Sequence, residues 1–170
     1  MGSLANLNLL HWVILALAAL ALIMAAAVDA RHYRIPNMFS LILLLLFPLY
    51  VLTASTPVMW EKHLVVFALM LLCGFALYAK NIAGAGDIKL LAVTSLWAGP
   101  EWFLVFLFIT SMTGGLLALA MTAHTYWQHR RHKGEGPLAL AKVPIPYGVA
   151  IAMGGLCTLI MMSQRVPPSA

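Results

Sequence analysis

The sequence predicts an all-α, polytopic membrane protein: a bundle of about six transmembrane helices, of which the fourth is short. Of its 170 residues, 63% are hydrophobic and only 9% are charged, whereas soluble domains carry about 25% charged residues. One water-soluble core of this size cannot hide so much apolar surface. The apolar residues also form runs separated by polar stretches, which is typical of successive membrane-spanning helices.

Six apolar segments are expected to be helices, since backbone that faces lipid must satisfy its hydrogen bonds internally. The fourth would give only about 16 Å of helix before Gly99 and Pro100 end it. It is either a short, tilted span or one extended by part of the Gly-rich loop before it. The chain would form one transmembrane domain over residues 1–170, with no separate soluble domain. The segments run roughly over residues 9–28, 38–54, 63–79, 88–98, 102–123 and 146–163, and the polar connections fall near 29–37, 55–62, 80–87, 99–101 and 124–145.

The basic residues predict how the helices are oriented. With six crossings, eight Lys and Arg residues fall on one side and only Lys62 and Arg165 on the other. Such an excess marks the cytoplasmic side. With five crossings, the basic 124–145 loop would change sides and the bias would largely vanish. Six spans with both termini outside are therefore expected, and the eight residues are Arg31, Arg34, Lys80, Lys89, Arg130, Arg131, Lys133 and Lys142.

The tryptophans support these boundaries, because all five lie near segment ends. Indole rings prefer the membrane interface, so the pattern favours an aromatic belt over simple core packing. The five are Trp12, Trp60, Trp97, Trp102 and Trp127.

Several classes of function find little support in the sequence. Nucleic-acid binding is not expected, because no basic face interleaved with aromatics extends beyond one short loop. The two cysteines lie in apolar runs and form no CxxC pair. Three histidines in the 124–145 loop lack carboxylate or cysteine partners at ligand spacing, so neither a metal nor a cofactor is predicted. That loop would instead contact anionic membrane lipid. The residues are Cys73, Cys157, His124, His129 and His132.

Two of the five acidic residues stand out by position. Asp29 ends the first predicted span and Asp87 begins the fourth, both at the cytoplasmic boundary, whereas Glu61, Glu101 and Glu135 fall in loops. A carboxylate at membrane depth is costly, and it is a functional hypothesis by default. Two facing carboxylates that share one proton supply the base and the acid that peptide hydrolysis by water needs.

Each aspartate also has a structural alternative. Asp29 would serve as a topology anchor next to Arg31 and Arg34, and Asp87 would serve as a helix N-cap. The surrounding residues favour chemistry at Asp87, which ends the run Gly84-Ala85-Gly86-Asp87 and is followed by Ile88 and Lys89. Two glycines just before a helix let the backbone approach a substrate or adopt a positive φ.

The chain resembles type IV prepilin peptidases, which are GxGD intramembrane aspartic peptidases, and among them the short form associated with tight-adherence (Flp) pili. Three blocks carry the resemblance, in order along essentially the whole chain. They are Asp29–Asn37, which contains Ile35-Pro36-Asn37 at the start of the second span; Gly84–Leu91, which contains the GxGD motif; and Pro144–Ala152, which begins the last span.

The resemblance implies roles for particular residues. Asp29 and Asp87 match the family's catalytic pair, while Gly84 and Gly86 match the glycines that shape the loop before the second aspartate. Lys89 matches the motif lysine, which would stabilise a charged aspartate, meet a lipid phosphate or simply snorkel to the interface. Pro36 and Asn37 match the residues that open the second span. The larger bifunctional members carry a cysteine-bearing cytoplasmic domain and methylate the new pilin terminus, but no such insertion exists here, so methyltransferase activity and zinc are not implied.

The expected function is therefore an endopeptidase of the bacterial cytoplasmic membrane, acting in pilus assembly. Its substrate would be a prepilin with a hydrophobic helix in the membrane and a basic leader on the cytoplasmic side, cut after a leader glycine. Three alternatives remain: a small transporter or channel, an inactive scaffold of a pilus or secretion assembly, and a GxGD protease with another membrane substrate. Both acids lie at one membrane edge, which argues against an ion path. The oligomeric state is left open.

Overall fold

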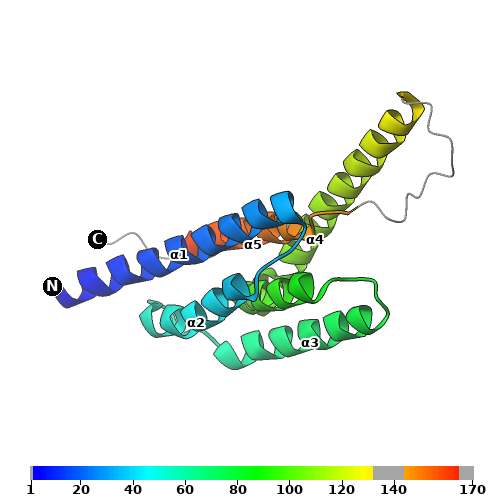
Figure 1. Ribbon diagram of the computed structural model, residues 1–170. Coiled ribbons are helices and arrows are strands. Elements are labelled where there is room, and N and C mark those ends of the chain that lie inside the picture. The colour runs from blue at the N-terminus through cyan, green and yellow to red at the C-terminus, as the bar shows by residue number, and fades with distance from the viewer. Residues whose placement is uncertain (1, 132–143, 165–170) are drawn as a thin grey trace.

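The computed structural model describes residues 2–131 and 144–164, and within these ranges its regular structure is entirely helical. Figure 1 shows α1, α2, α3 and α5 side by side with their axes roughly along one direction, while the later part of α4 rises from them at a steep angle. Three of them hold stretches long and apolar enough to cross a membrane, and the other two are apolar helices of 17 residues. The predicted all-α, polytopic bundle is confirmed. The helices are α1 (Gly2–His32), α2 (Asn37–Thr53), α3 (Trp60–Ala79), α4 (Ala85–Arg131) and α5 (Tyr147–Ser163).

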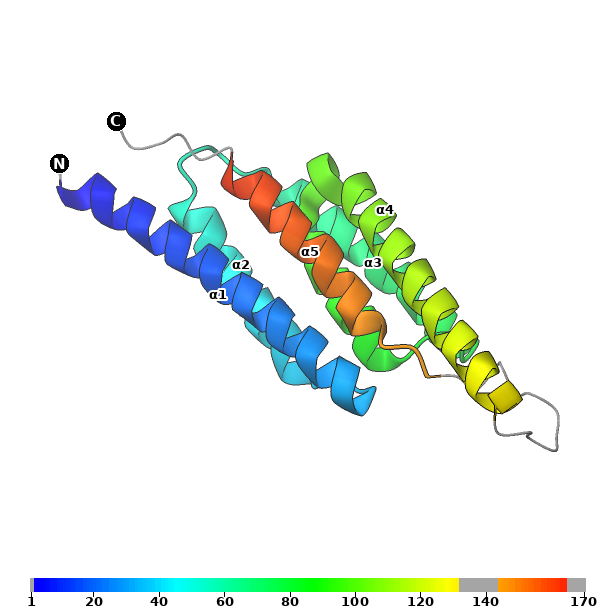
Figure 2. The ribbon, with the colours of Figure 1, turned by 90° about the horizontal axis from the view of Figure 1, so that it is seen from above.

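Helix α4 is two helical segments joined by a sharp reversal. Gly99 leaves the helical conformation, with φ 58° and ψ −176°, and Pro100 follows it. Figure 2 shows the second segment running back along the bundle. The six predicted apolar segments thus correspond to six helical segments. The fourth begins at Ala85, so it is extended by part of the preceding Gly-rich loop, as one of the two alternatives predicted.

A histidine from α3 completes the reversal. In a continuous helix the carbonyl of Leu96 would accept the N–H of residue 100, but Pro100 has no N–H to give. The Nδ1–H of His63 donates to the Leu96 oxygen instead, at 2.7 Å. The ring lies so close to the turn that a Cβ at Gly99 would come within 2.6 Å of both ring nitrogens. Only glycine suits both the backbone angles and this contact.

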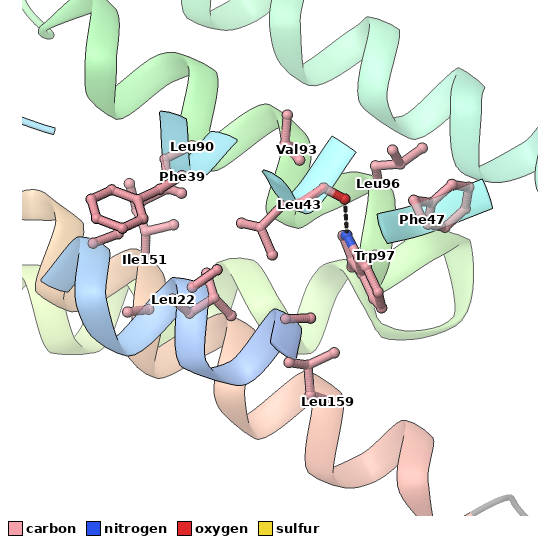
Figure 3. Close-up of a cluster of buried hydrophobic side chains, with 14 of the residues drawn as sticks. Leu22, Phe39, Leu43, Phe47, Leu90, Val93, Leu96, Trp97, Ile151 and Leu159 are labelled. Carbon is pink, nitrogen blue, oxygen red and sulfur yellow. Dashed lines mark hydrogen bonds between the residues drawn. The ribbon is translucent and has the colours of Figure 1, made fainter. Parts of the chain in front are cut away.

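The first segment of α4 forms the centre of the core. Every residue from 92 to 99 is buried, because this segment packs against α2, α3 and α5. The Nε1–H of Trp97 donates to the carbonyl oxygen of Leu43 at 3.0 Å, as Figure 3 shows. Trp97 belongs to a cluster of buried apolar side chains from α1, α2, α4 and α5. The others drawn in Figure 3 include Leu22, Phe39, Leu43, Phe47, Leu90, Val93, Leu96, Ile151 and Leu159.

The interface position predicted for Trp97 is therefore wrong. Its side chain is only 2% exposed, because it lies in the buried core between α4 and its neighbouring helices. A buried indole needs a partner for its N–H, and the Leu43 carbonyl provides one. Trp12, Trp60 and Trp127 are 46%, 48% and 60% exposed, so these three remain available to the interface.

Two predicted connections are shorter than expected. Residues 29–32 belong to α1 and residues 124–131 belong to α4. Both helices end in basic residues, which the negative end of a helix dipole favours. In α4 the guanidinium of Arg131 also lies 4.1 Å from the ring centroid of Trp127. His132, Lys133, Glu135, Lys142 and Arg165 lie outside the described residues.

The helix ends gather at two ends of the bundle (Figure 2). One holds the end of α1 and the starts of α2, α4 and α5, and we call it the aspartate end because it carries Asp29 and Asp87. The opposite end holds the beginning of α1, the connection from α2 to α3, and the Gly99 turn. The beginning of α1 and the end of α5 lie at this second end, as an even number of crossings requires.

Candidate active site

Asp29 lies in the last turn of α1 and is 3% exposed. Its Oδ2 accepts a hydrogen bond from the backbone N–H of Gly148 at 2.7 Å. Gly148 is in the first turn of α5, where N–H groups have no partner within the helix. The positive end of the α5 dipole therefore points at the carboxylate and stabilises its charged form. The position of Asp29 deep among these groups does not fit a solvated topology anchor.

Gly148 is a residue of this site that the sequence did not single out. A Cβ there would lie 2.9 Å from the Asp29 Oδ2 and 2.8 Å from the Ile35 Cδ1. The absence of a side chain is thus what lets the α5 backbone reach the carboxylate. The sequence does mark this position, since Gly148 follows Pro146 and Tyr147 at the start of the last apolar segment. Its neighbours in the chain, however, do not indicate that its N–H will contact Asp29, which lies 119 residues earlier.

Asp87 lies in the first turn of α4 and is half-buried. Because α4 begins at Ala85, Asp87 is inside the helix, and the alternative that it is the N-cap is wrong. Its carboxyl is hydrogen-bonded by the backbone of Gly84. A Cβ at Gly84 would lie 2.9 Å from the Asp87 Oδ2. This glycine therefore permits a close approach of the loop to the carboxyl.

The fold brings the two aspartates together although 58 residues separate them in the sequence. The first turn of α4 rests on the connection between α1 and α2, where a Cβ at Gly86 would come within 2.9 Å of the carbonyl oxygen of Ile35. The carboxyl groups are near enough for the charge of Asp29 to act on Asp87. Two like charges in a partly desolvated place repel, so the pair is more stable when it holds one proton.

Lys89 pairs with Asn37, where its Nζ donates to the Oδ1 at 3.1 Å. In the part of the chain that the structure describes, it makes no ion pair with Asp29 or Asp87. Asn37 is the first residue of α2, and Pro36 before it is extended, with φ −61° and ψ 136°. The lysine thus ties the start of α2 to the first turn of α4, next to the second aspartate.

This contact is expected to contribute little to stability. Asn37→Ala should lower the free energy of unfolding by about 0.5–1 kcal/mol, because both partners are exposed and water competes for the hydrogen bond. Lys89→Met should cost a similar amount, and the double variant should cost no more than either single one. Chemical denaturation in detergent measures all three. Additive losses would show that the two side chains act independently.

No three His, Cys, Asp or Glu side chains among residues 2–131 and 144–164 are placed to hold a metal ion. In the predicted histidine cluster, the Nε2 of His124 lies 2.9 Å from the amide nitrogen of Gln128, one turn along α4. At the aspartate end, the structure places two carboxyl groups that are hydrogen-bonded by the backbones of Gly84 and Gly148.

Comparison with known proteins gives one match. The model of the Type IV leader peptidase family matches residues 16–119, a range that includes both aspartates. No curated protein and no solved structure matches the chain.

Proposed function

The chain belongs to the Type IV leader peptidase family, and from this we propose that it is an intramembrane aspartic endopeptidase. Its substrate would be a prepilin of the type IV, Flp-like class, and the product a pilin freed of its cytoplasmic leader. The observation that carries the proposal is the pairing of a buried Asp29 with a half-buried Asp87 at one end of the bundle. No cofactor is needed for this chemistry.

The proposed reaction uses one water molecule between the two carboxyl groups. The ionised aspartate takes a proton from the water, whose oxygen attacks the carbonyl carbon of the scissile peptide bond. The protonated aspartate gives its proton to the leaving nitrogen as the C–N bond breaks. The pair then holds one proton again, as it did at the start. Hydrogen bonds from the Gly84 and Gly148 backbones keep each carboxyl in place.

The distribution of charge supports a cytoplasmic location for this site in the bacterial inner membrane. Among the described residues, six Lys and Arg side chains lie at the aspartate end and only Lys62 lies at the other. An excess of basic residues is typical of the cytoplasmic face. A leader made in the cytoplasm would meet the aspartates there. The six are Arg31, Arg34, Lys80, Lys89, Arg130 and Arg131.

Leader removal in cells tests the proposal. The chain is co-expressed with a type IV prepilin, processing is followed by gel shift, and the mass of the product gives the cut site. We expect a shortened pilin with one defined new terminus, and no shortening with a variant in which both aspartates are asparagine. An intact prepilin beside normal membrane levels of the unaltered chain would contradict the proposed function.

A second prediction concerns the glycine that contacts Asp29. Gly148→Ala is expected to slow leader cleavage about tenfold or more, because the new Cβ pushes against the Asp29 carboxyl and a displacement of 1 Å can cost on the order of 10²-fold. Gly115→Ala is the matched control, since a Cβ there meets nothing within 4 Å. Initial rates with purified protein in detergent micelles measure both. Equal rates would show that the Gly148 contact does not position Asp29.

A further inference from the structure

A second polar site lies at the opposite end of the bundle, away from the aspartates. It is a cavity of about 100 Å³ where the beginning of α1, the end of α2, the start of α3 and the Gly99 turn of α4 meet. The peptidase chemistry makes no use of it. Its wall includes two histidines, one glutamate and three further aromatic side chains, which are His11, His63, Glu101, Tyr50, Trp97 and Trp102.

Both histidines are buried, and the Nδ1 of each is hydrogen-bonded to an oxygen of a neighbouring helix. His11 is 3% and His63 is 5% exposed. The Nδ1 of His63 faces the carbonyl of Leu96, which can only accept, so Nδ1 carries a proton. The Nδ1 of His11 lies 3.2 Å from the hydroxyl oxygen of Thr53. That hydroxyl donates to the carbonyl of Leu49, so His11 must be the donor. In each neutral ring the remaining nitrogen, Nε2, is then an acceptor.

Glu101 adds a negative charge beside one of these acceptors. Its Oε2 lies 3.8 Å from the Nε2 of His63, which is too long for a direct hydrogen bond. When the His63 ring is neutral, the carboxylate oxygen and the Nε2 lone pair face each other across this gap as two acceptors, and a donor that lies between them can bond to both. The N–H of Trp97 cannot serve, because it is already committed to the carbonyl of Leu43.

The cavity therefore presents imidazole acceptors, one carboxylate and aromatic rings, beside the hydroxyl-bearing residues Tyr50, Ser55 and Thr56. This combination attracts cations, and aromatic faces favour ammonium groups in particular. A metal ion fits less well, because no three His, Cys, Asp or Glu side chains of the described ranges are close enough to coordinate one. A primary ammonium has three N–H donors, and it reaches acceptors about 2.8–3.0 Å away.

We infer that this cavity binds a primary ammonium group, with one N–H between His63 and Glu101. The volume suits an ethanolammonium-sized group. The exposed rings of Trp12 and Trp60 lie at the same end, and such rings favour the headgroup level of a bilayer. The ammonium is therefore that of an ethanolamine lipid or of a small free amine. This binding is independent of the peptidase reaction.

Titration of the full chain tests the site. The protein is placed in phosphatidylglycerol nanodiscs, ethanolammonium chloride is added, and tryptophan fluorescence reports on Trp97 and Trp102. We expect saturable binding that Glu101→Gln weakens about tenfold or more, because a hydrogen bond to a charged group is lost. Glu61→Gln is the matched control: an exposed carboxylate at the same end that does not line the cavity. Sodium chloride at equal ionic strength should give no saturable change.

A second probe keeps the test decisive even if Glu101→Gln does not fold. Tetramethylammonium has the same charge but no N–H, so the unaltered chain should bind it at least about tenfold more weakly. Equal affinity for the two cations, no saturable binding of ethanolammonium, or an equal loss in Glu61→Gln would each overturn the assignment. Nanodiscs that contain phosphatidylethanolamine then identify the source. If this lipid weakens the binding of free ethanolammonium, the two compete and the site belongs to the lipid headgroup. If ethanolammonium binds equally well with and without the lipid, the site belongs to a free amine.

Discussion

Asparagine in place of either Asp29 or Asp87 is expected to abolish leader cleavage, with a loss on the order of 10³-fold or more. Asparagine has nearly the shape of aspartate, but it can neither take a proton from water nor give one to the leaving nitrogen. The fold should survive both changes. In Asp29→Asn, for example, the side-chain oxygen can still accept the N–H of Gly148.

The two losses should not add. Groups that share one proton and one water act as a unit, so removing the second after the first changes little. Cleavage rates of the two single variants and the double variant, each normalised to protein in the membrane, measure this. Glu61→Gln is the control, because Glu61 is an exposed carboxylate at the other end of the bundle. Cleavage retained by either single variant would rule out a shared water.

Gly99→Ala is expected to cause the largest loss of stability, about 2–4 kcal/mol. A side chain at φ 58° and ψ −176° is strained by about 1–3 kcal/mol. The new Cβ would also lie 2.6 Å from the ring nitrogens of His63, which is itself buried, and such overpacking adds a similar cost. A fall of several degrees in the midpoint of thermal unfolding would follow.

Two further variants check the cause. Gly115→Ala lies in the second segment of the same helix, where a Cβ meets nothing, so it should leave the midpoint unchanged or raise it slightly. Adding His63→Ala to Gly99→Ala should cost less than the sum of the two single changes, because the overlap disappears with the ring. An unfolding midpoint for Gly99→Ala within one degree of the unaltered chain would contradict the role assigned to this turn.

The sequence predicted the helices because lipid leaves the backbone few choices. Each apolar run had to become a helix, and Gly99-Pro100 had to end one. The same local patterns singled out Asp29 and Asp87 as candidates, each at the edge of an apolar run, and Gly84 in the loop before Asp87. These features depend on neighbours in the chain, so they can be read before the packing of the helices is known.

Features that depend on packing were beyond the sequence. The burial of Trp97 follows from its place on a segment that packs against α2, α3 and α5, yet its position near the end of an apolar run indicated the membrane interface. The contacts of Gly148 with Asp29 and of Asn37 with Lys89 join helices that are distant in the sequence. The periodicity of apolar residues within one helix does not specify which other helices will pack against it.

The lengths of α2 and α5 also bear on how a charged leader reaches the aspartates. Seventeen residues span about 26 Å, which is less than the 30 Å hydrocarbon layer of a typical bilayer. Such a hydrophobic mismatch is relieved when the surrounding lipid thins. Headgroups and water would then lie closer to the Asp29 carboxyl at the start of α5 and to the half-buried Asp87. In the proposed reaction, such thinning would let the charged leader reach Asp29 and Asp87 while the apolar helix of the substrate stays in the hydrocarbon layer.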